Sequence, residues 1–281
     1  MTIFAAILLA LAAGVTEIVP VSGSGHLFLL AKLLGVPASG TEFQSFRAML
    51  YLGVAFGAIL FYHTQLGDMI RENLVLMGLR RPTGRSRVEP FGRRLGQLLL
   101  LATGPMVPAL LLNGLRLRME QHPGALAFVS LLFCVSGTLL YLAARGQRGK
   151  RSIHEMTLPD AVGAGLCQIP TLFPGLSRAA FPMALMLQRG LDGAAAAEFC
   201  GLMGIPVFLS AGVIQLLYAG RGEGSFAAAP YMILGFALSA LSCFFTLRFF
   251  TDQMACRRPT GFAYWSWGAG ILALILFLIS A

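Results

Sequence analysis

The chain has 281 residues, of which 57% are hydrophobic and only 12% are charged, whereas an ordinary soluble domain carries roughly 25% charged residues. This composition excludes a soluble globular protein and is typical of one that crosses a membrane through several helices. The formal net charge of +9 does not indicate nucleic-acid binding, because the basic residues lie in loops between apolar segments and form no single basic face.

Six apolar segments are long enough to cross a bilayer, which takes about 20 helical residues. They are expected at about 43–63, 96–115, 124–144, 198–219, 228–248 and 260–280. The predicted fold class is therefore an all-α integral membrane protein with a single membrane domain.

Two further regions are apolar but interrupted by Gly and Pro. In the first, arms 1–13 and 27–37 flank the stretch GVTEIVPVSGSGH (14–26), and the second, 158–189, contains QIPTLFPGLSR (168–178). At 1.5 Å per residue each arm reaches about half of the membrane. Each region is therefore predicted to form a re-entrant helical hairpin.

The basic residues predict the orientation. If both hairpins return to the side that they entered, loops 64–95, 145–156 and 248–258 share one side and carry fourteen Lys and Arg residues. The other side receives Lys32, Arg47, Arg116, Arg118 and Arg221. By the positive-inside rule the first side is cytoplasmic and both termini face outside. The hairpins then enter from opposite faces, which predicts an inverted repeat of about 1–150 and 151–281.

Three ionisable residues lie on the broken stretches. Glu17 and His26 are on the first and Arg178 is on the second. An ionisable side chain deep in a membrane is costly and usually serves a ligand or a proton path, and the broken helices of inverted repeats meet near the midplane. The alternative is that Glu17 and Arg178 form only a structural ion pair.

The two stretches also offer what a phosphate group requires. Arg178 can bind a phosphate through two parallel hydrogen bonds, and Gly-rich backbone and hydroxyl groups can supply further donors. The candidate donors are Ser22, Ser24, Gly25, Gly175 and Ser177. Glu17 would repel a phosphate unless a cation intervenes, which predicts bound Mg²⁺ or Ca²⁺. His26 would act as nucleophile or general acid.

The sequence resembles a known family at both stretches. GVTEIVPVSGSGHLFLL (14–30) resembles the first signature of the bacitracin-resistance family of undecaprenyl-diphosphate phosphatases, and GLCQIPTLFPGLSR (165–178) resembles the second, with Gln168 and the PGLSR core at the expected spacing. Segments 51–63 and 194–212 extend the resemblance over essentially the whole chain.

The resemblance implies an inverted repeat with two re-entrant hairpins in the bacterial inner membrane. It implies removal of the terminal phosphate of undecaprenyl diphosphate, which regenerates the carrier lipid for peptidoglycan synthesis. Glu17, His26 and Arg178 are implied to be catalytic, supported by the serines above and by Gln168, in a site open to the periplasm. A homodimer is compatible with this picture.

The chain also departs from the family pattern. Ala13 stands where the family usually has an acidic or amide residue, Gly23 replaces a serine, and residues 179–182 replace an S-G-x-T stretch. Lost ligands would lower the rate of hydrolysis. The alternative function is therefore a polyprenyl-phosphate translocase with little hydrolytic activity, although the presence of both Glu17 and His26 favours the enzyme.

Overall fold

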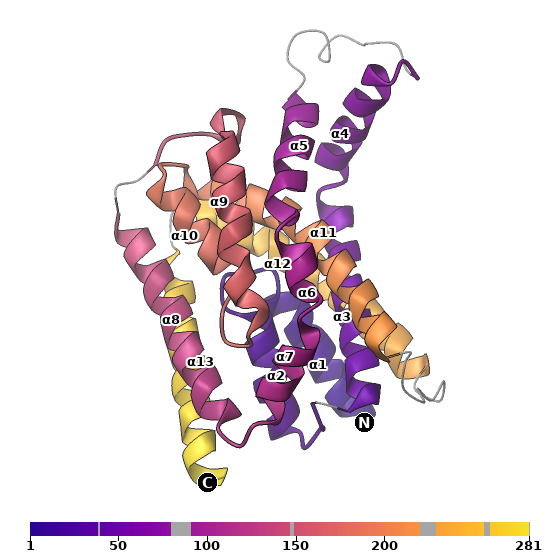
Figure 1. The fold of residues 1–281 in the computed structure, drawn as a ribbon, viewed down its shortest axis with the longest axis vertical. Coiled ribbons are helices and arrows are strands. Elements are labelled where there is room, and N and C mark those ends of the chain that lie inside the picture. The colour runs from indigo at the N-terminus through magenta and orange to yellow at the C-terminus, as the bar shows by residue number, and fades with distance from the viewer. Residues whose placement is uncertain (39, 80–90, 147–148, 220–228, 256–258, 281) are drawn as a thin grey trace.

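The computed structural model describes residues 1–38, 40–79, 91–146, 149–219, 229–255 and 259–280, and Figure 1 shows them as a bundle of helices. Within these ranges no β-strand forms, which confirms the all-α class. The helices are α1 (Ile3–Thr16), α2 (Gly23–Leu33), α3 (Thr41–Phe61), α4 (His63–Leu76), α5 (Phe91–Thr103), α6 (Met106–Leu110), α7 (Asn113–Gln121), α8 (Ala125–Arg145), α9 (Leu158–Gln168), α10 (Ala180–Gln188), α11 (Gly193–Ala219), α12 (Ala229–Ala255) and α13 (Thr260–Ser280), with 3-10 turns η2 (Ile153–Glu155) and η3 (Ile169–Leu172).

Five of the expected membrane spans are confirmed. Helices α3, α8, α11, α12 and α13 are long and apolar enough to cross a bilayer. The span expected at 96–115 is broken into α5, α6 and α7, with a bend of 56° before Asn113, and this bent pair passes the same test as a sixth candidate span. Gly104–Pro105 separates the first two of these helices, and a proline cannot donate the backbone hydrogen bond that a continuous helix needs.

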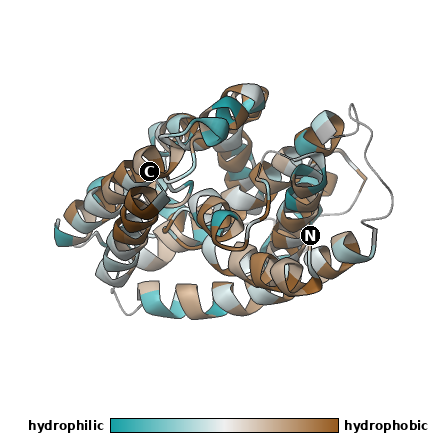
Figure 2. Cartoon of the chain, turned by 90° about the horizontal axis from the view of Figure 1, so that it is seen from below, coloured by the Kyte–Doolittle hydropathy of each residue, from teal (hydrophilic) through white to brown (hydrophobic). Residues whose placement is uncertain are grey.

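The outer surface of the bundle is apolar. Large side chains such as Phe245, Ile271 and Leu278 are more than half exposed, and the helix that carries the C-terminus is hydrophobic along most of its length in Figure 2. In water such a surface would cost free energy, whereas lipid tails solvate it. The structure therefore supports a multi-pass membrane protein.

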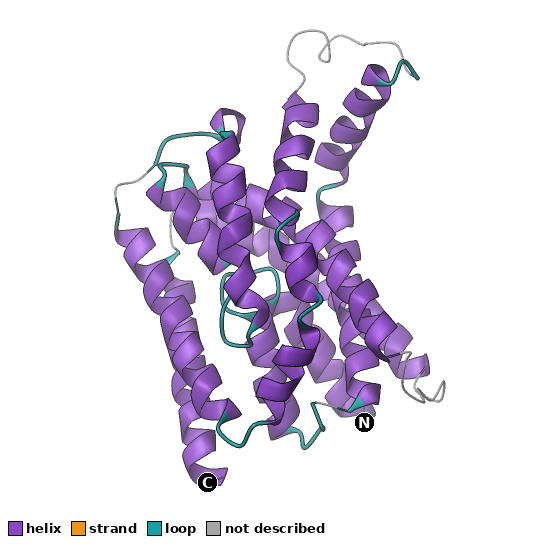
Figure 3. Ribbon diagram, viewed as in Figure 1, coloured by secondary structure: helices purple, strands orange, loops and turns teal. Residues whose placement is uncertain are grey.

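Helices packed from distant parts of the chain enclose the two broken stretches. Helix α3 packs against α11 and α12, α8 packs along α13, and α1 packs against α2 and α12. Likewise α9 packs against α10. The loops that join α1 to α2 and α9 to α10 lie at mid-height in the bundle (Figure 3). The re-entrant course of these helix pairs and the inverted repeat stay predictions.

Asp160 stabilises the N-terminal end of α9, which is not one of the candidate membrane spans. Its buried carboxylate accepts hydrogen bonds from Arg151 Nη2 at 2.8 Å, from Thr157 N at 2.8 Å and from Arg189 Nε. Burial alone would raise the pKa of Asp160, but these hydrogen bonds outweigh it and hold the pKa well below its ordinary value. The carboxylate thus ties α9 to the end of α10 in its ionised form.

Two arginines that the orientation argument counts on the outer side are buried within helices. Arg47 is in α3 and Arg116 is in α7, and both are buried. Their removal from the loop count widens the charge difference between the two sides. Arg221 and the basic residues at 80–90, 147–148 and 256–258 lie outside the described residues. Both termini lie at the end of the bundle opposite the α4–α5 extension (Figure 1), and their side of the membrane stays a prediction.

Candidate active site

The centre of the site is an ion pair between the two broken stretches. Arg178 Nη2 donates to Glu17 Oε2 at 3.0 Å, across 161 residues of sequence. The side chains are only 9% and 1% exposed. The Arg178 guanidinium also lies over the rings of Tyr51 and Phe208, at 4.9 and 5.0 Å from their centroids, which favours a cation at this place.

Ser22 joins the two loops. Its hydroxyl donates to Leu176 O at 3.1 Å and accepts from Gly175 N at 3.0 Å. Its φ of 67° makes it the one non-glycine residue with left-handed backbone in the part of the chain that the structure describes. Such a conformation costs about 1–3 kcal/mol and persists only where the surroundings fix it. The Ser22 hydroxyl therefore holds the loops together in this structure.

Glycines allow the two loops to touch. A Cβ at Gly25 would lie only 2.7 Å from Gly175 N, and Gly175 itself has a φ of 103°. Ser136 on α8 fixes the second loop, because its hydroxyl donates to Gly175 O at 3.0 Å and accepts from Ser177 N at 3.0 Å. Sequence reasoning missed Ser136, since one serine in an apolar span carries no signal of its own.

Because Gly23 has no side chain, Glu17 can lie directly against it. A Cβ at Gly23 would lie 2.3 Å from Glu17 Cδ and 2.6 Å from Glu17 Cα. The serine that the family resemblance expects here would therefore collide with the carboxylate in its present position. One turn before Glu17, the fully buried Ala13 contributes no polar group.

His26 faces α13. Its Nδ1 lies 2.8 Å from Ser22 O, and Trp265 Nε1 donates to its Nε2 at 2.9 Å. An indole nitrogen only donates and a carbonyl oxygen only accepts, so this arrangement assigns the proton to Nδ1 and leaves Nε2 unprotonated. The structure places His26 against Trp265 and gives it no hydrogen bond to the described Glu17–Arg178 pair. Trp265, 239 residues away in sequence, was not anticipated as its partner.

The other predicted site residues, Ser24, Ser177 and Gln168, contact different parts of the structure. Ser24 lines a cavity together with Arg178. The Ser177 hydroxyl accepts from Ala180 N at 3.2 Å at the start of α10. Gln168 Nε2 donates to Ala102 O at 3.3 Å and lies 3.1 Å from Met203 Sδ. Gln168 therefore ties α9 to α5 and α11 in this structure.

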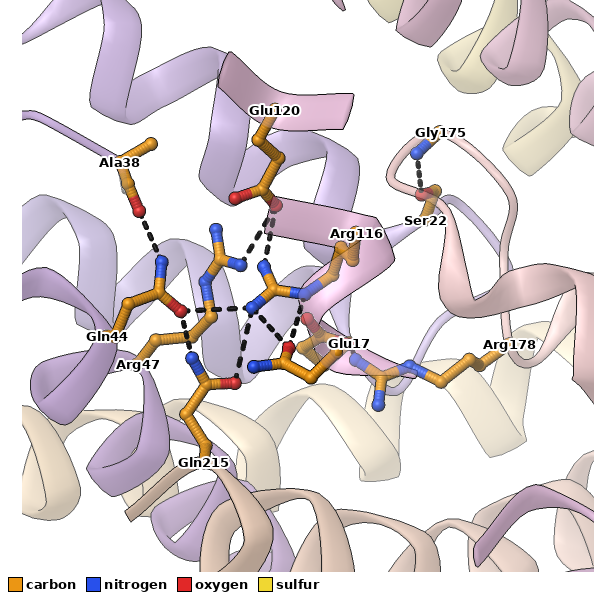
Figure 4. Close-up of polar contacts among 11 residues, drawn as sticks. Glu17, Ser22, Ala38, Gln44, Arg47, Arg116, Glu120, Gly175, Arg178 and Gln215 are labelled. Atoms are coloured by element: carbon orange, nitrogen blue, oxygen red, sulfur yellow. Dashed lines mark hydrogen bonds and ion pairs between the residues drawn. The ribbon is translucent and has the colours of Figure 1, made fainter. Parts of the chain in front are cut away.

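A small cavity of about 30 Å³ lies beside Arg178. Its polar lining consists of Ser24, Tyr51, Asn113, Thr171, Arg116, Arg178 and Gln215. Figure 4 shows that Arg116 belongs to a buried network with Arg47, Glu120, Gln44 and Gln215 beside the Glu17–Arg178 pair. Two signals could have revealed this network: an arginine inside the apolar segment 43–63, and Arg116 and Glu120 spaced four residues apart.

Glu17 is the carboxylate that pairs with Arg178, and it has one oxygen left for a cation. Its Oε1 is buried and has no hydrogen-bond partner among the described residues, and those residues contain no group of three or more His, Cys, Asp or Glu side chains that could hold a metal ion. Mg²⁺ commonly binds through one or two carboxylates, several waters and the substrate phosphates. The donor set fits such a substrate-assisted site and does not fit an all-protein cage.

Comparisons with known proteins identify the family of this chain. The family described as Bacitracin resistance protein BacA matches residues 6–272. The chain is 32% identical to the undecaprenyl-diphosphatase of Alkaliphilus metalliredigens, over 99% of this chain and 100% of the relative. It is 34% identical to that of Rubrobacter xylanophilus, over 98% of each chain, and 30% identical to that of Methanobrevibacter smithii, again over 98% of each. The chain belongs to the bacitracin-resistance protein BacA family.

Proposed function

We propose that this protein is an undecaprenyl-diphosphatase, which removes the terminal phosphate of undecaprenyl diphosphate and returns the carrier lipid for peptidoglycan synthesis. The observation that carries the proposal is the buried Glu17–Arg178 pair beside a cavity, in a chain whose full-length relatives carry that enzyme name. The lipid tail would lie between helices in the bilayer.

The reaction is hydrolysis of a phosphoric anhydride. The oxygen of a water molecule bonds to the terminal phosphorus, the bond from that phosphorus to the bridging oxygen breaks, and the bridging oxygen stays with undecaprenyl phosphate. Arg178 would turn from Glu17 to the phosphate oxygens and stabilise the charge that develops on them. Glu17 would orient the water and accept its proton. The Nε2 lone pair of His26 accepts the N–H of Trp265, so His26 would serve as a second proton acceptor only after that hydrogen bond breaks.

Mg²⁺ or Ca²⁺ would be held by Glu17 Oε1 together with the substrate phosphates. When bound, the cation would neutralise part of the diphosphate charge and so remove its repulsion from the carboxylate. A chelator is expected to abolish phosphate release, and added Mg²⁺ or Ca²⁺ is expected to restore it. Unchanged activity after exhaustive chelation would refute the proposed requirement for a cation.

The decisive experiment measures phosphate release from undecaprenyl diphosphate by detergent-purified protein. Arg178→Ala and Glu17→Gln are each expected to lower kcat by about a hundredfold or more, as the loss of one transition-state donor does in other enzymes. Arg118→Ala and Glu42→Gln are the matched controls, because both side chains are exposed and lie away from the cavity. A folded wild-type protein that binds the lipid but releases no phosphate would contradict the proposal and favour lipid translocation.

We further propose that the site opens to the periplasmic side of the bacterial inner membrane and that both termini lie outside. The buried network of Arg47 and Arg116 supports this, because it leaves fewer basic residues in the loops on the side of the termini. A reporter fused to the C-terminus that is active only outside the cytoplasm tests the topology, and cytoplasmic activity would overturn it. A homodimer stays a prediction, to be checked by the mass of the detergent-solubilised protein.

A further inference from the structure

The cavity beside Arg178 has a second buried arginine in its lining. We call this arginine and its two polar neighbours the cationic wall. Arg116 lines the same cavity, with Asn113 and Gln215 beside it. All three side chains belong to residues that are at most 6% exposed. The two arginines come from elements far apart in sequence, α7 and the loop before α10, and both line the cavity.

The charges around this wall do not balance. Arg47 Nη1 and Arg116 Nη1 both donate to a single oxygen, Glu120 Oε1, at 3.0 and 2.6 Å. Two buried cations therefore share one carboxylate, while Arg178 is matched by Glu17. A buried charge without a partner is expensive. A network that served only to hold helices together would be expected to balance its charges, whereas a surplus cation facing a cavity suits an anionic ligand.

The wall also has hydrogen-bond donors to spare. Asn113 Oδ1 accepts from Arg116 Nε at 2.9 Å and from Arg116 Nη2 at 2.6 Å. This directs the amide oxygen toward the arginine and leaves Asn113 Nδ2 buried with no partner among the described residues. In the network behind the wall, Arg47 Nε and Nη2 and Glu120 Oε2 are also buried without a described partner, but neither residue lines the cavity. Unpaired buried donors are rare and usually await a ligand or water.

We propose that Arg116 and Asn113 form a second phosphate subsite, so that a diphosphate spans the cavity with one phosphate on Arg178 and the other on Arg116 and Asn113. The choice of a diphosphate rests on the proposed function. The subsite would explain how the protein distinguishes a diphosphate from a monophosphate: only the longer anion reaches both guanidinium groups. It would also favour release of the monophosphate products, which engage one group at a time.

The test uses binding and needs no hydrolysis. Methylenediphosphonate, a diphosphate analogue with an uncleavable bridge, and methylphosphonate are titrated into the detergent-purified full chain by calorimetry. Hydrogen bonds to charged groups contribute about 1.5–3 kcal/mol, so wild type is expected to bind the diphosphonate about ten- to a hundredfold more tightly than the monophosphonate. In Arg116→Gln this preference is expected to fall to about one.

Asn113→Asp separates a ligand role from a structural one. The new carboxylate would pair with Arg116 and keep or strengthen the network, so the melting temperature is expected to hold or rise. The same carboxylate would repel a phosphate, so the preference for the diphosphonate is expected to disappear. Arg118→Gln, an exposed residue on the same helix, is the matched control and should keep the wild-type preference.

Three results would overturn the subsite: no preference in wild type, a preference retained by Arg116→Gln, or a preference retained by Asn113→Asp. The outcome is distinguishable from failure of the proposed function. If wild type prefers the diphosphonate but releases no phosphate from undecaprenyl diphosphate, the subsite stands and the enzymatic function falls. If wild type hydrolyses the lipid without preferring the diphosphonate, the enzymatic function stands and the subsite falls.

Discussion

Replacement of Gly23 by alanine tests whether the position of Glu17 controls activity. The added Cβ would lie 2.3 Å from Glu17 Cδ, 2.5 Å from Cγ and 2.6 Å from Cα. A side-chain rotation could relieve the first two contacts but not the third. To restore an ordinary contact of 3.4 Å, the backbone at Glu17 must move by about 0.8 Å, the difference between 3.4 and 2.6 Å.

A displacement of this size at a reacting group costs about a hundredfold in rate, and forced overpacking costs about 1–3 kcal/mol of stability. Gly23→Ala is therefore expected to lower kcat for undecaprenyl diphosphate by about a hundredfold and to lower the melting temperature in detergent. Phosphate release and thermal unfolding are measured on the same preparation, so that the rate is expressed per folded molecule.

Gly268→Ala is the matched control, because a Cβ at Gly268 on α13 meets nothing within 4 Å. That variant should keep both the rate and the melting temperature, since alanine also favours a helix more than glycine does. Wild-type activity and stability in Gly23→Ala would refute the reasoning, because Glu17 would then be free to move without loss.

Three other predictions follow from single contacts. Trp265→Phe removes the donor that occupies His26 Nε2 and frees this nitrogen to accept a proton, so kcat is expected to rise with little change in KM, whereas Trp267→Phe, whose N–H bonds to a threonine, should leave kcat unchanged; equal effects in both would contradict the role of Trp265. Asp160→Asn should cost about 2 kcal/mol at pH 7. Because the folded pKa of Asp160 is depressed, its stabilisation is complete above the unfolded value of about 4 and fades below it, so the melting temperatures of wild type and variant should converge as pH falls below 4. Ser136→Ala removes two buried hydrogen bonds from the second loop and should lower both stability and kcat; a change in melting temperature alone would show that the loop keeps its shape without the serine.

The sequence alone determined the membrane class, five of the spans and the two broken stretches. The reason is that hydrocarbon thickness sets a minimum helix length, and Gly and Pro interrupt helices wherever they cluster. Glu17 and Arg178 could also be identified as candidate site residues, because each is a charge in an otherwise apolar segment. Their motifs also carried the family resemblance that the comparisons confirm.

The sequence could not determine which groups meet. It predicted the span at 96–115 but not the end of α5 at Thr103 or the bend of 56° before Asn113, because hydropathy counts apolar residues and does not register a change of direction. It counted Arg47 and Arg116 among the charges on the outer side and did not reveal that both are buried. Only the tertiary structure set both arginines against Glu120 and placed one of them on the cavity of Arg178. The spacing of Arg116 and Glu120 allowed their pairing within one helix, but Arg47 and Gln215 reach them from other helices, and a single chain segment does not specify partners that other helices supply.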